Sequence, residues 1–170
     1  MKIRNVYFSK GFSAFYFDDQ AAIKAGAKQD GFVYCGSAQT EGFSAIRQSG
    51  ECISITLELE DGQFAQGDCA AVQYSGAAGR DSLFSTSQFI PLLEEKLKPR
   101  LIGLDVGSFL ESSKWLDELA NNPHLSHTAI QYGVSQALLE ASAKSNRATM
   151  CEIVCQEWNL PLVSEPLKLF

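Results

Sequence analysis

The clearest pattern in the chain is a pair of apolar-rich runs separated by a turn. Isoleucine and leucine occupy every second position from 53 to 59, so residues 52–59 are expected to form a strand with one buried face. A second run, at residues 64–72, follows Asp61-Gly62. Because aspartate and glycine tolerate the positive φ of a tight turn, the sequence predicts an antiparallel hairpin here.

The residues before this hairpin predict a further strand and a short helix. Residues 2–9 mix aliphatic and aromatic side chains and are expected to form the first strand. Asp18 and Asp19 precede good helix formers that begin at Gln20, and a carboxylate there can accept hydrogen bonds from the free N–H groups of the first turn. The glycine-spaced region that follows predicts a loop with a short strand around residues 32–35.

Beyond residue 80 the spacing of apolar residues changes from two to about 3.6, which predicts consecutive helices. The first is expected to end at Pro99, and the second at residues 121–123, Asn-Asn-Pro. The third, from 127 to 144, has the most regular apolar stripe. Thr149 and Glu152 have the spacing of a capping box and predict the start of a fourth helix.

The order of these elements indicates a fold class. Strands that precede a run of helices are typical of an α+β domain, so we predict an antiparallel three-stranded meander followed by a helical layer. The apolar residues from Leu162 onward resemble the start of one more strand at the end of the chain. No repeat or low-complexity linker divides the sequence, which favours one domain.

The composition is that of an ordinary globular domain, with 45% hydrophobic and 20% charged residues. A net charge of −6, with scattered basic residues, argues against nucleic acid as a partner. No stretch approaches the ~20 apolar residues that cross a bilayer, and the N-terminus lacks the apolar centre of a signal peptide. We therefore expect a cytoplasmic protein that binds neither nucleic acid nor a membrane.

The five cysteines are odd in number and include no C-x-x-C pair, which argues against a disulfide framework. Cys151 and Cys155 are four residues apart, so they share one helix face with a spacing that two metal ligands can use. Only His124 and His127 could complete such a site. We favour the other interpretation, in which both cysteines are small buried residues on a stripe that faces the core.

Two histidines and two adjacent aspartates are the remaining candidates for chemistry. His124 and His127 flank an expected helix start and could transfer protons, although a capping or surface role is commoner. Asp18 and Asp19 could bind a metal, although an N-cap and its neighbour explain them without a third ligand. No nucleophile motif or dinucleotide fingerprint occurs, so the residues name no reaction.

Strings of residues along the whole chain resemble one family. The longest begins at residues 59–62, resumes at 67–76 as Gly-Asp-Cys-Ala-Ala-Val-Gln-Tyr-Ser-Gly, and closes at 79–81. Shorter matching strings are found at residues 15–20, 30–32, 40–43, 47–48, 50–51, 89–91, 101–103, 127–130 and 136–138. The chain therefore resembles the N-terminal capping domain of the methylaspartate ammonia-lyase family, within the enolase superfamily.

The resemblance implies a longer parent protein whose modified (β/α)8 barrel, of ~250 residues, is absent from this chain. In the family, a barrel lysine removes the proton beside a carboxylate, and (2S,3S)-3-methylaspartate loses ammonia to give mesaconate in glutamate degradation. Mg²⁺ held by barrel acids neutralises the charge that develops, and K⁺ is a second cofactor. The resemblance also implies a homodimeric lyase, of which this chain would be an inactive part.

For this chain, the resemblance implies two substrate-binding residues but no catalytic residue and no metal ligand. Gln73 would reach the substrate amino group, where an amide can accept a hydrogen bond without becoming charged. Phe170 would line the pocket for the substrate methyl group at the start of the first barrel strand. We expect the capping domain to span residues 1–160 and the linker to the barrel to begin within 161–170. The alternative is a non-catalytic module that binds a small molecule or a partner and keeps the capping fold.

Overall fold

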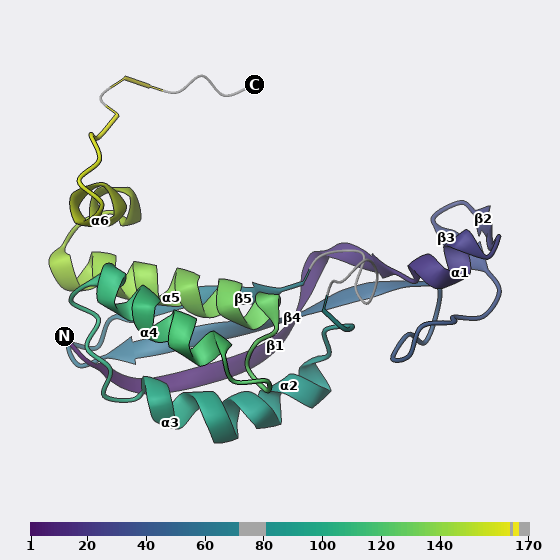
Figure 1. Ribbon diagram of the computed structural model, residues 1–170, viewed down its shortest axis with the longest axis horizontal. Coiled ribbons are helices and arrows are strands. Elements are labelled where there is room, and N and C mark those ends of the chain that lie inside the picture. The colour runs from purple at the N-terminus through teal and green to yellow at the C-terminus, as the bar shows by residue number, and fades with distance from the viewer. Residues whose placement is uncertain (72–80, 164, 167–170) are drawn as a thin grey trace.

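The computed structural model describes residues 1–71, 81–163 and 165–166. Its central element is an antiparallel sheet with the strand order β1-β4-β5, beside which the helices lie (Figure 1). The sheet consists of β1 (Ile3–Asp18), β4 (Arg47–Leu59) and β5 (Phe64–Ala70). No closed barrel occurs in the described residues, and the predicted meander with a helical layer is confirmed.

The turn between β4 and β5 forms as predicted. The Leu59 N–H donates to the Gln63 carbonyl at 2.8 Å, and Gly62 adopts a φ of 86°. The Asp61 carboxylate accepts from the Gln63 N–H at 3.0 Å, which fixes the turn further. Alternate apolar residues of β4 are buried on the face that meets the helices.

β1 and β4 extend beyond the end of β5 as a two-stranded ribbon (Figure 1). Their pairing shifts between Phe12 and Tyr16 and then continues to its last pair, Asp18 with Arg47. The ribbon carries an insertion that we call the distal lobe, residues 19–46, with α1 (Gln20–Lys24), β2 (Lys28–Asp30) and β3 (Val33–Cys35). The sequence predicted the start of α1 and a short strand in this lobe. It predicted a first strand over residues 2–9, which is much shorter than β1.

The helical layer begins with one continuous helical segment of three parts: α2 (Thr86–Leu92), the π-helical stretch η1 (Leu93–Leu97) and α3 (Lys98–Leu101). The prediction that this helix ends at Pro99 is wrong. Proline breaks an α-helix interior because it lacks an N–H and clashes with the preceding turn. Here the wider π-helical turn precedes Pro99, which lies in the first turn of α3, where no N–H is needed.

The remaining helices follow the prediction closely. They are α4 (Phe109–Ala120), α5 (Thr128–Asn146) and α6 (Met150–Glu157). α4 ends just before residues 121–123, and the capping box of Thr149 and Glu152 is complete in both directions. None of the described helices is long and apolar enough to span a membrane.

α5 lies directly on β5, and two glycines permit this close approach. A Cβ added to Gly67 would lie 2.0 Å from the carbonyl oxygen of Gly133, and one added to Gly133 would lie 2.6 Å from the Cys69 nitrogen. The apolar stripe that the sequence predicted faces this contact and is buried: Ile130, Val134, Ala137, Leu138 and Ala141. The core therefore lies between the sheet and the helices.

Side chains of α5 also reach the backbone along the free edge of β5. Gln136 accepts from the Asp68 N–H, Glu140 accepts from the Gln66 N–H, and Lys144 donates to the Phe64 carbonyl. Four residues of a helix advance about 6 Å, and two residues of a strand about 6.6 Å. Successive helical turns therefore meet alternate strand residues.

The C-terminal part differs from the prediction in two respects. Residues 161–163 are not in a strand, and the rest of the strand predicted from Leu162 onward, residues 167–170, lies outside the described residues. Cys151 is exposed and Cys155 is partly exposed, so the expectation that both are buried on a core-facing stripe is wrong. α6 turns its Ile153 side to the body instead.

Candidate functional site

The two residues that the resemblance selects, Gln73 and Phe170, lie outside the described residues. The described residues on either side of the segment 72–80 are Ala71 and Asp81. Ala71 is 7% exposed and belongs to the core cluster that holds the end of β5. Asp81, on the other side of the segment, is held by α5.

Asp81 and His127 join this side to the N-terminus of α5. The Asp81 carboxylate accepts from the Thr128 N–H at 2.8 Å and from its hydroxyl at 2.6 Å. His127 Nδ1 accepts from the Ala129 N–H at 3.1 Å, so Nε2 carries the proton and donates to the Ser82 carbonyl at 3.1 Å. Both ring nitrogens of His127 are therefore used in holding backbone.

This arrangement confirms a capping role for His127, and its ring is also packed. The rings of Phe84 and Phe89 lie edge-on to it at centroid distances of 5.1 and 5.2 Å. His124, by contrast, is exposed at the surface. Neither histidine is arranged as a proton-transfer group in the described structure.

Glu51 connects the ribbon to the helical layer. Its carboxylate accepts from the Thr86 N–H at 2.6 Å and from the Thr86 hydroxyl at 2.8 Å, at the start of α2, and pairs with Lys10 at 3.2 Å. Desolvation raises the pKa of Glu51, but the bonds from Thr86 and the Lys10 charge outweigh it, so the net pKa is lowered. This carboxylate therefore fixes where α2 begins.

Asp19 organises the distal lobe. Its side chain is fully buried and caps α1 by accepting from the N–H groups of Ala21 and Ala22 at 3.1 and 3.4 Å. It also accepts from the Gln39 N–H at 2.5 Å, the Thr40 N–H at 2.9 Å and the Thr40 hydroxyl at 2.6 Å. One carboxylate thus joins the helix start to the loop that returns to β4.

These contacts predict an acid-sensitive lobe. Desolvation raises the pKa of Asp19, but the bonds from Thr40, Gln39 and Ala22 outweigh it and lower the pKa from 3.8 to about 2. A carboxyl group whose pKa is lowered by folding stabilises the fold at pH values above its pKa in the unfolded state. This stabilisation is lost as the pH falls through its pKa in the folded state. We expect Asp19 to contribute about 2 kcal/mol at neutral pH that disappears as the pH falls from about 4 to about 2.

Urea unfolding at stepped pH measures this contribution. Asp19→Asn is expected to lower stability at pH 7 and to flatten its dependence on pH in the acid range. Asp117, an exposed residue of α4, provides the matched control Asp117→Asn, which should leave the profile unchanged. Parallel profiles for wild type and Asp19→Asn would contradict the prediction.

Asp18 and Arg47 form a buried ion pair where the ribbon meets the distal lobe. The Arg47 Nε and Nη2 atoms donate to the two Asp18 oxygens at 2.6 and 2.7 Å, and Nη1 donates to the Phe32 carbonyl at 3.1 Å. The guanidinium also lies 5.0 Å from the ring centre of Tyr34 and 5.9 Å from that of Tyr16. One arginine thus fixes the ribbon to β3.

The two aspartates are therefore an N-cap and its ion-paired neighbour, the interpretation that the sequence favoured over a metal site. Within residues 1–71, 81–163 and 165–166, no group of three or more His, Cys, Asp or Glu side chains could hold a metal ion. Sequence reasoning missed the roles of Arg47, Glu51 and Asp81. Each pairs with a residue at least 29 positions away, and no local pattern marks such a contact.

The chain matches known proteins over nearly its whole length. The family model described as methylaspartate ammonia-lyase N-terminus matches residues 1–159. The methylaspartate ammonia-lyase of Citrobacter amalonaticus is 53% identical over 170 residues, which is 100% of this chain and 41% of that protein. The chain thus spans about two fifths of the length of this relative.

Solved structures give the same result in three dimensions. The C. amalonaticus enzyme containing (2S,3S)-3-methylaspartic acid has a TM-score of 0.92 at 53% identity, over 98% of this chain and 41% of that one. The Mg complex of β-methylaspartase from Clostridium tetanomorphum has a TM-score of 0.91 at 50% identity, over 97% of this chain and 40% of that one. A dipeptide epimerase from Methylococcus capsulatus shares only the fold, with a TM-score of 0.55 at 15% identity, over 91% of this chain and 35% of that one.

Proposed function

Because this chain belongs to the methylaspartate ammonia-lyase family, as its N-terminal part, we propose that the longer protein containing it is a carbon–nitrogen lyase. Its reaction removes ammonia from (2S,3S)-3-methylaspartate and gives mesaconate, in glutamate degradation. The observation that carries this proposal is the TM-score of 0.92, at 53% identity, with the enzyme that contains this amino acid. None of the comparisons supports the alternative of a non-catalytic binding module.

We assign the reacting groups and the cofactors to the part of the protein beyond this chain. Mg²⁺ takes about six oxygen ligands, and the described residues do not fit it. Asp18 and Asp19 are adjacent, but one is paired with Arg47 and the other accepts five hydrogen bonds. We therefore place Mg²⁺ and K⁺ in the C-terminal barrel, which is this chain's partner within the same polypeptide.

The share of the work that we assign to this chain is to cap the active site and to shape its specificity. Charge that develops beside a carboxylate is stabilised better where water is excluded, since electrostatic interactions are then stronger. We propose that Gln73 accepts a hydrogen bond from the substrate amino group and that Phe170 packs against its methyl group. What supports the first role is the match of the family model, which includes Gln73.

Boundaries, assembly and location complete the proposal. We place the capping domain at residues 1–160 and the start of the linker at 161–170, in accord with a family match that ends at residue 159. We further propose a cytoplasmic homodimer. The five cysteines are free, as is usual for proteins in a reducing compartment.

The full-length protein provides the test. With Mg²⁺ and K⁺ present, we expect it to form mesaconate from (2S,3S)-3-methylaspartate, measured by the ultraviolet absorbance of the product, while residues 1–170 alone form none. Gln73→Ala in the full-length protein should lower kcat/KM ~10- to 100-fold, because a hydrogen bond to a charged group contributes about 1.5–3 kcal/mol.

A control variant separates the role of the amide from a general loss of stability. Gln63 lies in the exposed β4–β5 turn, so Gln63→Ala should leave kcat/KM unchanged. A full-length protein without lyase activity would overturn the proposed function. Unaltered kinetics of Gln73→Ala would contradict only the proposed role of this amide and would leave the proposed lyase function standing.

A further inference from the structure

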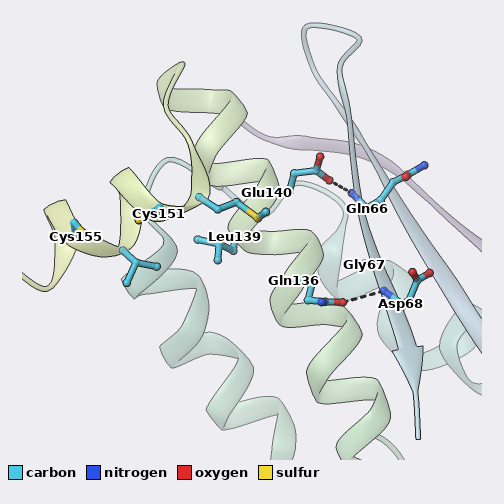
Figure 2. A pocket seen from close by; sticks show the side chains of 10 residues that line it. Gln66, Gly67, Asp68, Gln136, Leu139, Glu140, Cys151 and Cys155 are labelled. Carbon is cyan, nitrogen blue, oxygen red and sulfur yellow. Dashed lines mark hydrogen bonds between the residues drawn. The ribbon is translucent and has the colours of Figure 1, made fainter. Parts of the chain in front are cut away.

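A pocket of about 660 Å³ opens between the free edge of β5, α5 and α6. Figure 2 shows part of its lining, with Leu139 on α5 and Cys151 and Cys155 on α6. The lining is mostly apolar and also includes Val154 of α6. Large apolar surfaces of folded proteins are normally covered by another group, so this pocket points to a binding partner.

α6 carries apolar residues on two of its sides. Ile153 is 2% exposed and packs on the body of the domain. Cys151, Val154 and Cys155 are three and four residues apart, so they share a second face, and all three line the pocket. Met150 lines it too and is 47% exposed. A surface helix normally has one apolar stripe, and a helix with more is buried. Within the described residues only the Ile153 side of α6 is covered.

α6 is fixed in its position, so it cannot close the pocket by moving towards β5. At its C-terminal end, Glu157 accepts from the N–H groups of Phe109 and Leu110 at 2.9 and 2.5 Å, at the start of α4. The Trp158 ring lies 6.0 Å from that of Phe109. Movement of α6 would break these contacts and leave two N–H groups of α4 without their acceptor. The pocket is therefore formed before a partner binds.

The polar side chains of the pocket offer little to orient a small molecule. Gln136 and Glu140 already accept hydrogen bonds from the backbone of β5. The Asp68 carboxylate accepts from the Ser54 hydroxyl at 2.6 Å. Small-ligand sites combine an apolar lining with polar groups that fix the orientation of the ligand. Apolar side chains of a protein therefore fit this pocket better than a small polar ligand.

The segment after α6 extends the apolar surface beside the pocket. The Cys155 thiol donates to the Pro161 carbonyl at 3.8 Å, so this segment passes next to a residue of the pocket. Leu160, Leu162 and Val163 are 52%, 55% and 70% exposed. A run of exposed aliphatic side chains next to an apolar pocket is typical of a surface that a folded partner covers.

The length of the relatives identifies the partner. This chain corresponds to 41% of the C. amalonaticus protein, so the proposed longer protein has most of its residues beyond this chain. The segment that follows α6 leads to that part, and a domain attached there lies within reach of the pocket.

We propose that the pocket between β5, α5 and α6 is a docking surface for the C-terminal part of the same polypeptide, which inserts apolar side chains into it. This inference rests on the proposed longer protein but not on its lyase reaction.

Cys151 is a native probe of this contact in the full-length protein. Its thiol is exposed in the structure of this chain, so docking should cover it. Alkylation with N-ethylmaleimide, followed by mass spectrometry of peptides, measures its rate of reaction. We expect the rate to be at least ~10-fold lower in the folded full-length protein than in urea, because a covered thiol reacts only when the contact opens. Equal rates would overturn the proposal.

A charge placed in the pocket should disrupt the contact. Val154→Arg in the full-length protein should raise the alkylation rate of Cys151 about 10-fold or more over wild type, since a buried unpaired charge is costly. The matched control is Gln156→Arg, at an exposed position of α6 that does not line the pocket, and it should leave the rate unchanged. Equal increases for the two variants would contradict a contact made through the pocket.

Photo-cross-linking identifies the occupant without depending on these variants. Benzoylphenylalanine in place of Met150 of the full-length protein should form a cross-link to a residue beyond 170, in a polypeptide of unchanged mass. A cross-linked product of doubled mass would show that a second copy covers the pocket and would overturn the proposal. Lyase activity is measured separately. Its absence would overturn the proposed function and leave the docking surface intact.

Discussion

Gly67→Ala is expected to destabilise the domain by about 3 kcal/mol or more, a large effect for one added methyl group. The new Cβ would lie 2.0 Å from the Gly133 carbonyl oxygen and 2.8 Å from the Ala137 nitrogen. Both are backbone atoms of α5 and cannot rotate away. The helix would have to lift from β5, and the interface between them forms much of the core.

Chemical unfolding with urea, followed by circular dichroism, measures the loss. Gly103→Ala is the control, because Gly103 has a φ of 85° and nothing within 4 Å of an added Cβ. It should cost only the backbone strain of about 1–2 kcal/mol. Equal losses at the two positions would contradict the prediction that the close approach of α5 makes position 67 the more sensitive one.

Arg47→Ala is expected to cost about 3 kcal/mol and to loosen the distal lobe before the body. The Asp18 side chain is 4% exposed and that of Arg47 16%, so the pair is nearly removed from water. Breaking a buried pair leaves an uncompensated charge, which is the main cost. The Phe32 carbonyl and the face of the Tyr34 ring would lose their partner as well.

A double-mutant cycle distinguishes this cost from general loss of packing. Asp18→Asn combined with Arg47→Met removes both charges, so it should be less destabilising than the sum of the two single changes. Hydrogen exchange across residues 19–46 would report loosening of the lobe directly. Additive effects, with exchange in the lobe unaltered, would show that the pair does not hold the lobe in place.

Elements with a local cause were predicted from the sequence. The β4–β5 hairpin depends on alternation and on Asp61-Gly62, the start of α6 on Thr149 and Glu152, and α5 on one apolar stripe. Each pattern lies within about 20 residues, where spacing determines the outcome. The α+β class followed from the order of these elements.

What the sequence could not predict depends on distant contacts. The length of the ribbon depends on pairing β1 with residues at least 29 positions away, and Phe12 to Tyr16 shows no simple alternation. Continuation of a helix through Pro99 depends on a π-helical turn that has no clear sequence signal. The roles of Gln73 and Phe170 came from family resemblance and remain predictions, since both lie outside the described residues.

The free edge of β5 limits how copies of this domain can associate. An exposed strand edge is a template on which another chain can extend a sheet. Here Gln136 and Glu140 already accept from the Asp68 and Gln66 N–H groups, and Lys144 donates to the Phe64 carbonyl. A strand from another chain would have to displace these three side chains before it could pair with β5, so α5 protects this edge against intermolecular sheet growth.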